Sequence, residues 1–128
     1  MKKIAEAALT EIQNGKSFAL AIILKSSGST PREAGATMLI REDGTIVGTV
    51  GGGVMEAHIL RRSPEVIKNG ESVLSEFVLE QNDAASIGAV CGGRATILID
   101  FFDGTSPETL RYFERLLKAA VSDERSYI

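Results

Sequence analysis

Three consecutive glycines, Gly51 to Gly53, separate an apolar run of strand character from a segment with helical spacing. Glycine adopts positive φ angles without Cβ strain and lets other groups approach the backbone closely. A glycine turn that opens a helix leaves backbone N–H groups unpaired at the positive end of the helix dipole, where anions bind favourably. The feature predicts a strand–turn–helix unit. The turn alone supports two functions equally, an anionic ligand site or a tight connection that needs small residues for packing.

The composition is that of one ordinary globular domain. The chain has 128 residues, 44% hydrophobic and 24% charged, and aliphatic side chains must supply most of the core because it has no Trp. A net charge of −3 without a long basic run argues against nucleic-acid binding. The single cysteine, Cys91, cannot form an internal disulfide and fits a reducing compartment. Glu6 and Glu11 interrupt any signal-peptide core, and no apolar run could span a membrane, so we expect a cytoplasmic protein.

Hydrophobic periodicity predicts an α/β (α+β) fold with a single domain over residues 1–128. The run from Phe18 to Leu24 is typical of a strand covered on both faces, and Asp43-Gly44 indicates a hairpin. Pro64 is expected to divide or kink its helix, with Ser63 capping the second piece. We expect a compact mixed β-sheet of about five strands with three to four helices. The expected elements are helix 2–14, strands 18–24, 36–40 and 45–50, helix 54–69, strands 72–79 and 94–102, and a helix from 107.

The standard nucleotide-binding motifs are absent from the glycine turn. A P-loop requires Lys-Ser or Lys-Thr after the glycines, but Val54-Met55 follows here. The dinucleotide fingerprint requires a third glycine where Glu56 stands. The chain also lacks the Gly-x-Ser-x-Gly motif of serine hydrolases.

A polar segment, Ser29-Thr30-Pro31-Arg32, is the second candidate for ligand contact. Pro31 holds the preceding residue extended, and Arg32 offers a planar fork suited to phosphate or carboxylate. Beside the Gly51–Gly53 turn, this segment would complete an oxyanion pocket. The alternative is that Arg32 is an ordinary solvated surface residue.

Glu56 falls in the first turn of the helix that follows the glycines. A carboxylate there either stabilises the helix by about 0.3–1 kcal/mol through the dipole, or faces a ligand that carries paired N–H donors, such as a pterin edge. His58 is expected on the surface, and it has no second ligand at metal-binding spacing. Cys91-Gly92-Gly93 is either a buried, inert site or an exposed turn whose thiol reaches a ligand.

The ordered series of these motifs resembles the XdhC/CoxI family, the accessory factors of xanthine dehydrogenase and related molybdenum hydroxylases. The resemblance covers roughly residues 15–102. It is carried by Gly28-Ser29-Thr30-Pro31-Arg32, Gly35-Ala36, Asp43-Gly44, Gly48, Gly51-Gly52-Gly53, Glu56 and Cys91-Gly92-Gly93.

The resemblance implies a molybdenum cofactor (molybdopterin) chaperone that binds the cofactor transiently, helps it mature and inserts it into the hydroxylase, without catalytic or metal-ligating residues of its own. Some relatives carry a cysteine at the position that Gly53 occupies here. Because this chain has glycine there, Cys91 is its only thiol. The implied cofactor-binding residues are Ser29, Thr30, Pro31, Arg32, Gly51, Gly52, Gly53, Glu56, Cys91, Gly92 and Gly93.

The resemblance also implies partners. These are the apoenzyme of a xanthine dehydrogenase-like molybdenum hydroxylase, a sulfurtransferase, and a separate Rossmann-domain chain, because larger relatives add a C-terminal Rossmann-like domain that this sequence lacks. A homo-oligomer is expected, and neither nucleic acid nor membrane is. Two alternatives stay open: an enzyme or binding module for a small phosphorylated or nucleotide-like ligand, and a non-catalytic assembly module. The only acid/base pair for an enzyme would be Glu56 and His58, which point to different faces of a helix.

Overall fold

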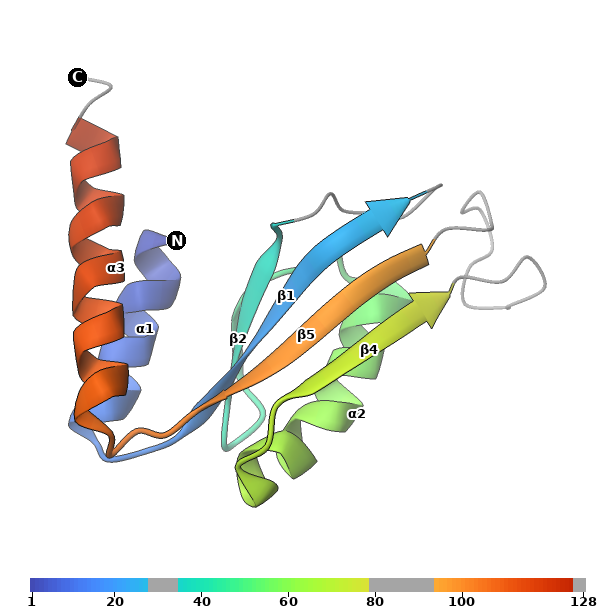
Figure 1. The fold of residues 1–128 in the computed structure, drawn as a ribbon, viewed down its shortest axis with the longest axis horizontal. Helices are drawn as coiled ribbons and strands as arrows, with labels where there is room; N and C mark the ends of the chain where they lie inside the picture. The colour runs from blue at the N-terminus through green and yellow to red at the C-terminus, as the bar shows by residue number, and fades with distance from the viewer. Residues whose placement is uncertain (28–34, 79–93, 126–128) are drawn as a thin grey trace.

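A five-stranded sheet with the strand order β3-β2-β1-β5-β4 forms the centre of the protein (Figure 1). The computed structural model describes residues 1–27, 35–78 and 94–125. Within these ranges the α/β class is confirmed. The elements are α1 (Lys2–Gln13), β1 (Phe18–Ser27), β2 (Thr37–Arg41), β3 (Ile46–Gly48), α2 (Gly53–Asn69), β4 (Val73–Val78), β5 (Arg94–Phe102) and α3 (Pro107–Arg125).

The sheet is antiparallel at each of its four described junctions, so the expectation of a mixed sheet is corrected in this respect. The strands β2 and β3 form the hairpin expected at Asp43-Gly44, where Gly44 has a φ of 88°. Helix α2 then carries the chain from one edge of the sheet to the other, where β4 pairs with β5. Among the described strands no parallel pair arises, because the crossover through α2 ends at the far edge, beside β5, which runs in the opposite direction.

Helix α2 covers one face of the sheet. Alternate residues of the central strands point toward it, as the two-residue period of a strand requires. In β1 these residues are Ala19, Ala21 and Ile23, and each is fully buried. They pack with Met38, Ile40, Val50, Met55, Ile59, Val66, Ala95, Ile97 and Ile99 in one apolar cluster.

Helices α1 and α3 lie side by side against the other face, at one end of the sheet (Figure 1). Their core includes a stack of Phe18 on Phe102, with ring centroids 5.6 Å apart, and an edge contact of Phe18 with Phe113 at 5.3 Å. These helices lie over only one end, so no described helix covers the other end of this face. Leu24 lies there, where the register of β1 against β5 shifts, and it is 45% exposed. The expectation that the apolar run is covered on both faces is therefore wrong at Leu24.

Pro64 does not divide α2, which runs unbroken from Gly53 to Asn69 with the proline inside it. Ser63 is fully buried, and its hydroxyl donates to the carbonyl of Ile59 at 2.6 Å, so it does not cap a second helical piece. The apolar residues before and after Pro64, Ile59 and Val66, pack in the same core cluster. Their burial holds the helix together despite the hydrogen bond that proline removes.

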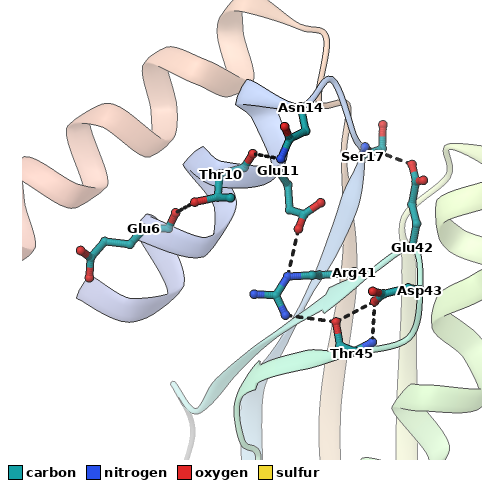
Figure 2. Close-up of polar contacts among 9 residues, drawn as sticks. All are labelled: Glu6, Thr10, Glu11, Asn14, Ser17, Arg41, Glu42, Asp43 and Thr45. Atoms are coloured by element: carbon teal, nitrogen blue, oxygen red, sulfur yellow. Dashed lines mark hydrogen bonds and ion pairs between the residues drawn. The ribbon is translucent and has the colours of Figure 1, made fainter.

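An ion pair ties α1 to the β2–β3 hairpin (Figure 2). Arg41 Nε lies 2.9 Å from Glu11 Oε1, and Arg41 Nη1 donates to Thr45 Oγ1 at 3.1 Å. Thr45 in turn donates its hydroxyl and its backbone N–H to Asp43 Oδ1, which lowers the pKa of Asp43. Because Glu11 is buried, with 8% of its surface exposed, it depends on Arg41 for charge compensation.

Replacing Arg41 alone should therefore destabilise the fold more than replacing Arg41 and Glu11 together. We expect Arg41→Gln to lower the free energy of unfolding by about 1–3 kcal/mol, because it leaves the Glu11 carboxylate buried and unpaired. The double variant Glu11→Gln with Arg41→Gln should recover part of that loss. A double-mutant cycle by urea unfolding measures the difference, and additive losses would contradict the coupling.

Of the glycines whose surroundings the structure describes, Gly104 should be the least tolerant of a side chain, because a Cβ there would overlap the backbone carbonyl of Lys16. We expect Gly104→Ala to cost about 1–3 kcal/mol, since backbone must move to make room. Gly15→Asn is the control. Gly15 has a φ of 67° and open space around it among the described residues, and asparagine tolerates that conformation. Equal melting temperatures for the two variants would refute the steric argument.

Candidate functional site

The amino end of α2 is built entirely on glycine backbone. Gly51, Gly52 and Gly53 have φ angles of 115°, 72° and 64°, which side-chain-bearing residues rarely adopt. Gly52 is the N-cap residue, and no side chain of the described residues caps the helix. The first-turn N–H groups of α2 therefore have no capping side chain, and they lie at the positive end of the helix dipole.

Glu56 lies in this first turn and is held in place by Thr49. The hydroxyl of Thr49 donates to Glu56 Oε2 at 3.0 Å and accepts the backbone N–H of Gly51 at 3.0 Å. A Cβ placed on Gly52 would lie 3.7 Å from the same Glu56 oxygen. The turn, the helix start and the carboxylate therefore form one site, in which an acceptor group stands beside backbone donors.

The glycines of this region serve two different purposes. A Cβ on Gly48 would lie 2.8 Å from the carbonyl oxygen of Thr37 and 3.2 Å from Ile4 Cδ1, so Gly48 allows β3 to pack closely. A Cβ on Gly53, in contrast, would meet no described atom within 4 Å. Close packing therefore explains why position 48 is glycine. Position 53 requires glycine because of its backbone conformation, and no described atom covers the helix start there.

A cleft of about 510 Å³ lies between the start of α1 and strands β2 and β3, with Gly48 in its wall. Lys2 and Lys3 contribute positive charge to its wall. Gly35, the first described residue after the gap at 28–34, also lines it. The lining residues are Met1, Lys2, Lys3, Ile4, Gly35, Thr37, Val47 and Gly48.

The structure brings together four of the residues expected to bind a ligand, Gly51, Gly52, Gly53 and Glu56. Ser29, Thr30, Pro31 and Arg32, and likewise Cys91, Gly92 and Gly93, lie outside the described residues, so their roles stay predictions. The sequence patterns do not single out Thr49. Its signal is a hydroxyl two residues before the glycine turn, a position where such side chains bond to the backbone.

His58 is half-buried, whereas a surface position was expected. Its ring lies against Phe77 of β4, with centroids 5.1 Å apart, and its Nε2 is buried without a hydrogen-bond partner among the described residues. Burial lowers the pKa of His58, and the charges of Arg62 and Arg61 lower it further. In the part of the chain that the structure describes, no three His, Cys, Asp or Glu side chains gather as a metal site would require.

Within the same described ranges, no helix has the length and apolar character to cross a membrane.

Comparisons with known proteins identify a family, a curated relative and a similar solved structure. Residues 11–78 match the model of the XdhC and CoxI family. The uncharacterized protein YqeB of Escherichia coli (strain K12) is 40% identical over 99 residues, which are 77% of this chain and 18% of that protein. A crystal structure described as a xanthine dehydrogenase from Bacillus halodurans has a TM-score of 0.71 at 24% identity, over 92% of this chain and 35% of that one. The chain thus spans a minor part of both relatives.

The lowered pKa of His58 predicts a loss of stability on acidification. The unfolded chain, with an ordinary histidine pKa near 6.5, binds the proton more tightly than the folded protein, so protonation favours unfolding as the pH falls through that value. We expect the melting temperature to fall between about pH 7 and pH 5.5. His58→Phe keeps a ring against Phe77 and should reduce this fall, and parallel curves for parent and variant would contradict the assignment.

Proposed function

Because the chain belongs to the XdhC and CoxI family, we propose that it binds the molybdenum cofactor transiently and helps to insert it into a xanthine dehydrogenase-type hydroxylase. Family membership supports an accessory role toward enzymes of this class. Cofactor binding, the residues that perform it and the partners are our proposal. The chain spans only part of its relatives, so the function of a whole relative need not be contained in it.

One observation carries the proposal: the carboxylate of Glu56 stands at the same helix end as the uncapped first-turn amides. Molybdopterin carries a phosphate and a pterin edge rich in N–H donors. Backbone N–H groups at a helix start suit a phosphate, and a carboxylate suits the paired donors of the pterin. A ligand with only a phosphate would be repelled by Glu56, so the pairing favours a ligand that presents both groups.

The chain's own residues would bind and orient the cofactor. Thr49 holds the Glu56 carboxylate in one direction, and the glycines admit the ligand to the backbone. We propose that Arg32 adds a guanidinium to the phosphate contact, and that Cys91, with Gly92 and Gly93, supplies a second contact region. A sulfurtransferase and a separate Rossmann-domain chain are proposed as further partners.

The enzyme alternative has less support. It needs Glu56 and His58 to act as an acid/base pair. Glu56 is bonded to Thr49 before the helix, whereas the ring of His58 packs against Phe77 of β4. Each of the two side chains therefore contacts a different neighbour, Thr49 for Glu56 and Phe77 for His58. A stoichiometric binding protein without turnover fits this arrangement better.

We expect Glu56→Gln to weaken molybdopterin binding roughly tenfold or more, because a charged hydrogen-bond acceptor is lost. Thr49→Val should weaken it less, since the carboxylate remains but is no longer oriented. Arg32→Ala should weaken it as well. Isothermal titration calorimetry with the isolated cofactor measures each affinity.

Glu65→Gln is the matched control, because Glu65 is an exposed glutamate of the same helix, beyond its first turn. It should bind like the parent. If Glu56→Gln and Arg32→Ala also bind like the parent while their circular dichroism is unchanged, the site is wrongly assigned. Stabilisation by nucleotides or sugar phosphates instead of pterins would favour the enzyme alternative.

A further inference from the structure

We draw no further inference here: the strongest candidate, the apolar face of the sheet beyond the ends of α1 and α3, where Leu24, Leu74 and Val78 are exposed, carries no proposal because nothing in the part of the chain that the structure describes shows what covers it.

Discussion

The pairing of β1 with β5 is the interaction on which the other elements depend. It runs from Phe18 opposite Phe102 to Ser27 opposite Arg94 and joins two parts of the chain that are far apart in sequence. One face of this pair supports α2, and one end of the other face supports α1 and α3. Both core clusters include side chains that these two strands present, so without the pair neither cluster would form.

The sequence predicts the elements well where periodicity is strong and fails where tertiary packing decides. Helix α1 and strand β5 match their predicted ranges closely, because their apolar residues follow a clear period. Pro64 was expected to interrupt α2, but burial of the residues on both sides holds the helix together. The antiparallel sheet and the exposure of Leu24 follow from where the crossover ends and where α1 and α3 stop. Neither is encoded in a local pattern.

The candidate site was predictable in its composition but not in its internal bonding. The glycines and Glu56 are adjacent in sequence, and a helix start necessarily brings them together. The hydrogen bond from Thr49 to Glu56 spans seven residues and depends on the path of the turn. His58 shows the same limitation, because its position against Phe77 results from the way α2 crosses the sheet. The spacing of residues in the sequence predicts which of them lie together at a helix end, whereas the orientation of their side chains depends on the surrounding fold.

The glycine start of α2 has an evolutionary consequence. Gly48 and Gly51 to Gly53 have no side chains, and their φ angles exclude most substitutions. If the turn binds the proposed cofactor, few substitutions at these positions are available to distinguish one ligand from another. Under the proposed function, divergence in specificity would then arise mainly in the neighbouring segments, while the backbone amides of the turn are retained. Such a division lets one scaffold acquire new preferences without rebuilding its most constrained part.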